Sequence, residues 1–164
     1  MLSSLEEAFE RLKKAKEAEE EANLLGIEGM EHQAYRELLS MADYLGDFPE
    51  DCKTPENQVA KCQSTVYVTG EMKDGKMYYN GTSDASFVQG ELAILVNAMS
   101  NRTPCEVVVA GPRVHRFLKD LKGIISLSMT RGEGFMGIYE RMREIACNFC
   151  SEEQLKNQES ASQS

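Results

Sequence analysis

The 164-residue sequence has no tryptophan, only two histidines, and fewer basic than acidic residues, with 18 Lys and Arg against 27 Asp and Glu. The formal net charge is therefore -9, and the isoelectric point is about 4.8. A protein that neutralises a phosphate backbone needs clustered Lys and Arg, so nucleic acids and acidic membrane surfaces are poor candidates for partners. Neither His32 nor His115 has the spacing to another Cys or His that is typical of a metal cluster, so the sequence predicts no metal site.

The sequence also lacks a long apolar run. No segment approaches the roughly 20 apolar residues that a membrane-spanning helix needs. The N-terminal segment MLSSLEEAFERLKKAKEAEEEA is too rich in Glu for a signal or transit peptide. The length corresponds to one domain that can bury a core without disulfide or metal staples. We therefore expect a soluble cytoplasmic protein, or a protein of a plastid or another organelle whose leader has been removed.

The five cysteines are an odd number, scattered through a domain that can fold without cross-links. This pattern predicts reduced thiols in a reducing compartment rather than a disulfide framework. Cys147 and Cys150 have the CxxC spacing of redox motifs, but they come at the end of a predicted helix and no second pair completes a zinc site, so we expect a structural role. Cys52 precedes Cys62 in one polar loop and could act as a resolving thiol.

The periodicity of apolar residues predicts helices at both ends of the chain and a small sheet between them. Asp74-Gly75 supplies the positive φ angles of a tight turn between two alternating runs, which predicts an antiparallel hairpin. In chain order we expect an acidic helix over about 3–24, a helix over 31–45, a loop over 47–61, strands over 64–72 and 76–81, helices over 88–99, after Pro112 and over 130–149, and a disordered polar tail over 151–164.

These elements predict an α+β fold in which helices pack on one face of a small antiparallel sheet. The domain spans 1–150, with its core at about 30–150. Because two strands alone are marginal in water, we expect a third. The candidate is Val107–Ala110, although TPCE at 103–106 is also typical of a helix start with Pro104 in its first turn. Gly90, inside a helix, indicates close packing against another element.

Cys62 is distinguished by its place in the sequence. In QVAKCQSTVYV it ends a polar loop and precedes a run that alternates like a β-strand. A thiol at this place can be an inert filler, a metal ligand, half of a disulfide or a nucleophile, and free cysteines in general are buried and inert. A nucleophilic thiolate is favoured by nearby positive charge, which Lys61 supplies in sequence and Arg131 could supply through the fold.

Three segments occur in this order and at fitting separations: NQVAKCQSTVYV, TSDASFVQG and LSMTRGEGFMGIYERMREIA. Together they resemble the SufE family of sulfur-acceptor proteins, over roughly 38–146. The resemblance implies a SufE/IscU-like fold for the domain and makes Cys62 the persulfide acceptor. It also implies a set of residues that contact the partner or support the loop: Lys61, Gln63, Ser64, Ser83, Asp84 and Arg131.

The function implied by the resemblance is that of a covalent carrier rather than an enzyme. Such a protein takes persulfide sulfur from a SufS-type, pyridoxal-phosphate-dependent cysteine desulfurase, stimulates that enzyme, and passes the sulfur to a downstream acceptor of a SufBCD-type scaffold in iron-sulfur cluster assembly. The pyridoxal phosphate belongs to the partner, and no cofactor is expected to bind directly. An apolar pocket beneath the loop would raise the thiol pKa and keep the resting group inert until the partner docks.

Other interpretations remain open from the residues alone. An IscU-like cluster scaffold would need further Cys, His or Asp ligands converging on Cys62, and the sequence offers no recognisable set. A non-catalytic interaction or regulatory protein would use the acidic N-terminal helix as its docking surface. Lys61 stands where the family commonly has glycine, so the loop backbone can differ, and Asp84 is also well placed to cap the following helix. A homodimer is left open.

Overall fold

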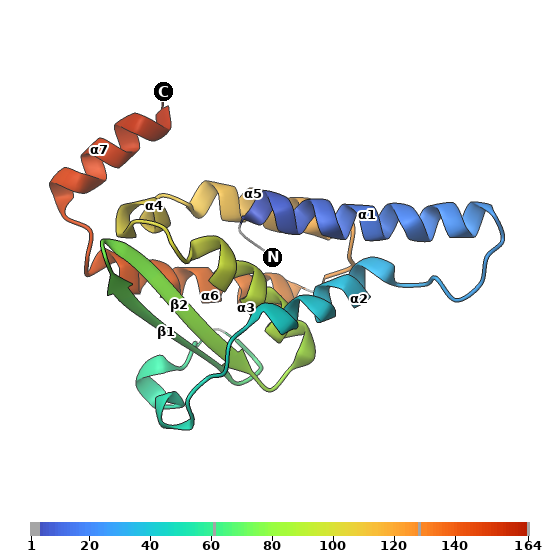
Figure 1. The fold of residues 1–164 in the computed structure, drawn as a ribbon, viewed down its shortest axis with the longest axis horizontal. Coiled ribbons are helices and arrows are strands. Elements are labelled where there is room, and N and C mark those ends of the chain that lie inside the picture. Colours follow the sequence, from blue (N-terminus) through green and yellow to red (C-terminus); the bar gives the residue numbers. More distant parts are fainter. Residues whose placement is uncertain (1–3, 61, 128, 164) are drawn as a thin grey trace.

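The computed structural model describes residues 4–60, 62–127 and 129–163. The elements in chain order are α1 (Leu5–Leu24), α2 (Gln33–Ser40), the short 3-10 helices η1 (Met41–Tyr44), η2 (Glu50–Cys52) and η3 (Pro55–Asn57), β1 (Val66–Lys73), β2 (Lys76–Ser83), α3 (Ser86–Met99), α4 (Pro104–Val108), α5 (Gly111–Lys122), α6 (Met129–Cys147) and α7 (Glu152–Gln163). The predicted α+β class is confirmed. Figure 1 shows the hairpin at one side of the molecule, with the longer helices stacked beside it.

The hairpin forms for the reason that the sequence indicates. Strands β1 and β2 pair antiparallel along their whole length, and both Asp74, with φ 51°, and Gly75, with φ 80°, adopt the positive φ angles that the turn requires. Alternate residues of the strands face inward, so Val68 and Met77 are buried while their neighbours are not. The sheet in the described part of the chain has two strands.

Segment 107–110 does not supply a third strand, because it belongs to α4 and the turn after it. The Thr103 side chain accepts a hydrogen bond from the backbone N–H of Glu106, and the Glu106 side chain accepts one from the N–H of Thr103. This capping box, with Pro104 in the first turn, fixes a helix start and overrides the β-branched composition of the residues that follow.

Helix α3 packs against β2, and α6 packs against β1, so that the inner face of the hairpin lies against both helices. Leu92 of α3, which is fully buried, lies against Gly81 of β2, and Ile145 of α6 lies against Gly70 of β1. The backbone of Gly90 lies against α2, where an added Cβ would collide with the carbonyl oxygen of Leu38. The packing that Gly90 indicates in the sequence is therefore a helix crossing, and it fixes the position of the residues next to it.

Helix α1 packs on α2 and α5, and the Glu19 side chain accepts a hydrogen bond from the N–H of Gln33 at the start of α2. The C-terminal end of α1 extends past the other helices in Figure 1. Ser4 caps the helix by accepting a hydrogen bond from the N–H of Glu7, and Leu5, Ala8 and Leu12 are buried. None of the helices in the described part of the chain combines the length and the apolar character needed to cross a bilayer.

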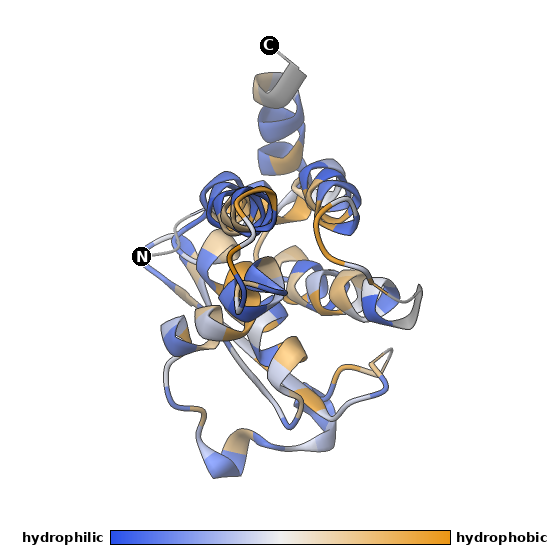
Figure 2. Cartoon of the chain, turned by 90° about the vertical axis from the view of Figure 1, so that its right-hand side faces the viewer, coloured by the Kyte–Doolittle hydropathy of each residue, from blue (hydrophilic) through white to orange (hydrophobic). Residues whose placement is uncertain are grey.

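Two features of the C-terminal region correct the sequence-based expectations. Cys105 and Cys150 form a disulfide, so the expectation that all five cysteines are reduced is wrong. A helix, α7, occupies the segment expected to be a disordered tail, because Ser151 and Gln154 form a reciprocal capping pair and Leu155 packs on the core. Figure 2 shows that the rest of α7, which ends at the C label, is mostly hydrophilic.

Candidate functional site

The loop that carries Cys62 is closed at its base by backbone hydrogen bonding. The N–H of Val59 donates to the carbonyl of Val66 at 2.8 Å, and Gln58 forms an isolated antiparallel bridge with Tyr67. Val59 is itself buried, so this end of the loop is anchored in the core. The polar segment that leads to it therefore brings Cys62 to the mouth of the hairpin, as the sequence predicts.

The Cys62 thiol is half-buried and faces the first turns of α6. Its Sγ donates a hydrogen bond to the carbonyl oxygen of Gly134, with an Sγ to oxygen distance of 3.5 Å. Burial, together with the nearby charge of Glu91, raises the pKa of the Cys62 thiol to about 11. The hydrogen bond also favours the neutral thiol, because a carbonyl oxygen accepts a hydrogen bond from S–H but cannot stabilise a thiolate. The resting group is therefore protonated near neutral pH.

A cavity of about 250 Å³ lies beside this thiol. It is bordered by the Cys62 loop, the start of α3 and the start of α6, and its walls are formed by Cys62, Gln63, Ser64, Ala85, Phe87, Val88, Glu91, Arg131 and Gly134. The Arg131 guanidinium lies over the Phe87 ring, 4.4 Å from the ring centre. The cavity thus has an apolar wall covered by a cation, with the thiol at its edge.

Glu91 is the charged residue that the sequence analysis did not identify. It is 1% exposed, and its Oε2 atom has no hydrogen-bond partner among the described residues. Burial raises the pKa of its carboxyl to about 8, and the charge of Arg131 partly opposes this rise. The signal in the sequence was that Glu91 is the one charged residue in SFVQGELAILVNAM, the segment that becomes α3. A single acidic residue within an apolar helix indicates a buried carboxyl, which is rare in folded proteins and therefore a candidate for a functional role.

The predicted site residues occupy different places. Gln63, Ser64 and Arg131 line the cavity with Cys62, whereas Ser83 and Asp84 do not. Lys61 lies outside the described residues.

The side chain of Asp84 accepts a hydrogen bond from the backbone N–H of Thr65 at 3.2 Å, and the N–H of Asp84 donates to the Thr65 carbonyl. Asp84 therefore holds the end of the Cys62 loop and does not cap α3, whose N-cap is Ala85. Ser83 shapes the same connection: its Oγ accepts from the N–H of Ala85, and its own N–H donates to the Gln89 side chain.

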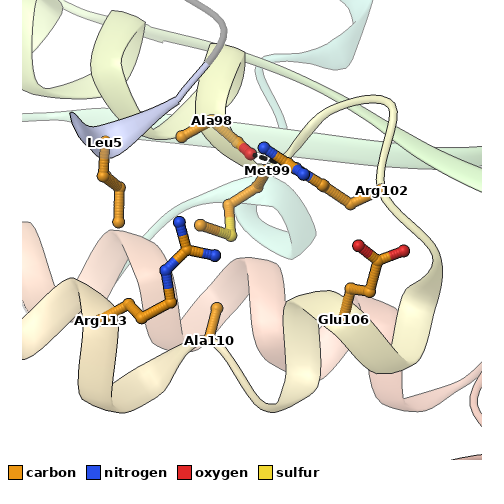
Figure 3. A pocket seen from close by; sticks show the side chains of 7 residues that line it. All are labelled: Leu5, Ala98, Met99, Arg102, Glu106, Ala110 and Arg113. Atoms are coloured by element: carbon orange, nitrogen blue, oxygen red, sulfur yellow. Dashed lines mark hydrogen bonds between the residues drawn. The ribbon is translucent and has the colours of Figure 1, made fainter. Parts of the chain in front are cut away.

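The remaining free cysteines among the described residues are Cys52, which is half-buried, and Cys147, which is exposed. No group of three or more His, Cys, Asp or Glu able to hold a metal ion occurs within the described part of the chain. Another cavity, of about 30 Å³, lies between Leu5, Met99 and Arg113, and it shares no residue with the Cys62 cavity. In Figure 3, Arg102 and Glu106 border it, and the Nε of Arg102 donates to the Ala98 carbonyl at 3.2 Å. Its volume suits a water molecule.

The fold and the site together define a small α+β domain that holds a single sheltered thiol at the mouth of a hairpin. The chain belongs to the SufE family: the family model described as "SufE: Fe-S metabolism associated domain" matches residues 10–146. The resemblance carried by the three sequence segments is confirmed.

The relatives span most of the chain. An uncharacterized SufE-like protein of Synechocystis is 35% identical over 70% of this chain and 70% of its own. The sulfur acceptor protein CsdE of Escherichia coli is 29% identical over 65% of this chain and 71% of its own. A solution structure of a hypothetical protein from Thermus thermophilus superposes with a TM-score of 0.58 over 84% of this chain and 94% of that chain. The sequence identity is 18%, so this likeness shows a shared fold and no more.

Proposed function

We propose that this protein is a sulfur acceptor that receives persulfide sulfur on Cys62 from a SufS-type cysteine desulfurase. The observation that carries the proposal is the half-buried Cys62 thiol at the edge of a cavity, within the region that matches the SufE family. The sulfur acceptor CsdE among the relatives supports the same reading. The protein acts as a carrier and as an activator of the desulfurase, in the cytoplasm, and it relays sulfur to a SufBCD-type scaffold for iron-sulfur cluster assembly.

The chemistry requires only an exchange between sulfur atoms. The Cys62 sulfur attacks the outer sulfur of the persulfide on the desulfurase, a new S–S bond forms on Cys62, and the partner's cysteine leaves as a thiolate with the electron pair of the broken bond. No oxidant is consumed, because the transferred sulfur stays at the same oxidation level. The pyridoxal phosphate that generates the persulfide belongs to the desulfurase.

A neutral and half-buried thiol suits a carrier that must not react in the absence of its partner. With a pKa of about 11, Cys62 has little thiolate near neutral pH and reacts slowly with small electrophiles or stray disulfides. Docking of the desulfurase would have to move the loop out of the cavity before transfer. The base of the loop stays fixed during such a movement, since Val59 is buried and bonded to Val66.

The test is intact-mass analysis after incubation with free cysteine and a SufS-type desulfurase, followed by peptide mapping. We expect a gain of one or more sulfur atoms on Cys62 and no gain in Cys62→Ser. Cys52→Ser and Cys147→Ser are matched controls, because both residues are free thiols away from the cavity, and both variants should load normally. Sulfur spread over all free cysteines, or no gain, would contradict the acceptor role of Cys62.

A further inference from the structure

Glu91 occupies a position that folding alone does not explain. Its side chain is 1% exposed in the middle of α3, and Oε2 makes no hydrogen bond to any described residue. A buried polar atom without a partner destabilises the folded state, whereas a Leu or Met of similar size would pack there without this cost. A buried carboxyl with one unpartnered oxygen is therefore expected where its chemistry is used.

The place of Glu91 relative to the thiol supplies the second observation. Glu91 and Cys62 line the same cavity from different elements, and the charge of Glu91 acts on the thiol. Of the described residues that line this cavity, Glu91 is the one carboxyl and Arg131, from α6, is the one cation. The Gly90 backbone, held against Leu38, fixes α3 so that the next side chain faces inward.

We propose that Glu91 accepts the proton of the Cys62 thiol during persulfide transfer. This inference rests on the proposed function and adds a residue to it. The thiol proton moves to Oε2 of Glu91 while Cys62 still borders the cavity, and the resulting thiolate bonds to the outer sulfur of the partner's persulfide once docking has moved the loop. The S–S bond of the persulfide breaks, and its electron pair remains on the partner's cysteine as a thiolate. Protons and electrons balance without a further reactant.

The environment of Glu91 suits this role. A general base is most effective when its pKa lies near the working pH, because a useful fraction is then ionised and its affinity for a proton is still high. Burial brings the pKa of Glu91 to about 8, well above that of an exposed carboxyl, and Arg131 limits the rise. The Cys62 thiol, with a pKa of about 11, stays neutral while Glu91 titrates, so an ionised carboxylate and a thiol coexist above about pH 8.

The decisive measurement is a single-turnover rate of sulfur transfer from a desulfurase already carrying its persulfide, with the product on Cys62 followed by quenched mass analysis. We expect Glu91→Gln to slow transfer by about 10²-fold near neutral pH. Glu71→Gln, which changes an exposed acid on β1, is the matched control and should transfer at the wild-type rate.

Two further readouts separate a proton acceptor from a structural residue. Formate, tested against chloride at equal ionic strength, should restore transfer at least several-fold in Glu91→Ala, because the enlarged cavity admits a small carboxylate. Glu91→Leu should fold at least as stably as the wild type and still transfer slowly.

The outcomes distinguish a wrong proposed function from a wrong role for Glu91. If wild-type Cys62 takes up no sulfur, the proposed function itself is wrong. If wild-type Cys62 loads and Glu91→Gln or Glu91→Leu loads at the same rate or faster, the function stands and Glu91 is not the proton acceptor. Failure of formate to accelerate Glu91→Ala would overturn the inference as well, provided that the variant is folded by circular dichroism.

Discussion

Replacing Glu91 with leucine should change how the stability of this protein depends on pH. The carboxyl has a pKa of about 8 in the folded state against 4.5 for an ordinary glutamate, because burial disfavours its charged form. Between these two values the folded state holds a proton that the unfolded state has released, so the free energy of unfolding falls as the pH rises. The effect of this one residue is present in full below about pH 4.5 and lost above about pH 8.

The magnitude follows from the difference between the two pKa values. At about 1.4 kcal/mol per pH unit, this difference corresponds to a loss of at most about 5 kcal/mol, of which about 3 to 4 kcal/mol falls between pH 5 and pH 8. Glu6, Glu19 and Glu56 have lowered pKa values, so their contributions are lost only as the pH falls below about 4.5, outside this window. Removing the unpartnered oxygen also stabilises the Leu variant by about 1 to 3 kcal/mol at every pH.

The assay is urea unfolding of the wild type and of Glu91→Leu at several pH values from about 5 to 8. We expect the wild type to lose stability steadily over this range, while the variant stays nearly level and is more stable throughout. Parallel curves for the two proteins would refute the reasoning, since they would show that the carboxyl titrates alike in the folded and the unfolded chain. A less stable variant would mean that Glu91 has a partner that its burial does not reveal.

Further predictions concern the thiols and the loop. In the free protein, iodoacetamide should modify exposed Cys147 well before Cys62, because burial and the charge of Glu91 raise the Cys62 pKa to about 11; peptide mapping that finds Cys62 modified first would contradict the sheltered thiol. Reducing the Cys105–Cys150 disulfide, or replacing both residues with serine, should lower the free energy of unfolding by about 4 kcal/mol for a cross-link separated by 45 residues, and an unchanged denaturation midpoint would show that the cross-link constrains little. Asp84→Ala should cost about 1 kcal/mol and speed the alkylation of Cys62 several-fold, because the loop loses its side-chain anchor; an unaltered alkylation rate would mean that the backbone contacts hold the loop without it.

The hairpin and the Cys62 loop could be predicted from the sequence because their signals are local. Alternation specifies the face of each strand, and Asp74-Gly75 specifies the turn, so neither depends on distant residues. Gln63, Ser64 and Arg131, which the motif segments mark as site residues, line one cavity with Cys62. The sequence left segment 107–110 open between a strand and a helix because two local signals conflicted there. The β-branched residues favoured a strand, and the helix start at Thr103, with its capping box, prevailed.

The features that the sequence did not yield depend on contacts between distant segments. Cys105 and Cys150 lie in α4 and after α6, and no spacing rule joins two cysteines that the packing of these helices brings together. The periodicity of apolar residues predicts which face of a helix is buried, and an acidic residue such as Glu91 does not contribute to that pattern. Its burial therefore could not be predicted in this way. The sequence indicated Asp84 as a helix cap because capping partners are close in sequence. Its observed partner, Thr65, precedes the other strand of the hairpin and is 19 residues away in sequence.

Under the proposed function, the hydrogen bond between Val59 and Val66 limits how far Cys62 can carry sulfur. With the base of the loop pinned, only the residues between Val59 and Cys62 can extend, and a chain gains at most about 3.5 Å per residue, so the thiol reaches about 10 Å from its anchor. This radius is a requirement on the partner. If the persulfide of the desulfurase lies more than this distance below the contact surface, Cys62 cannot reach it in place. The persulfide-bearing cysteine of the desulfurase would then have to move outward for the two sulfur atoms to come into contact.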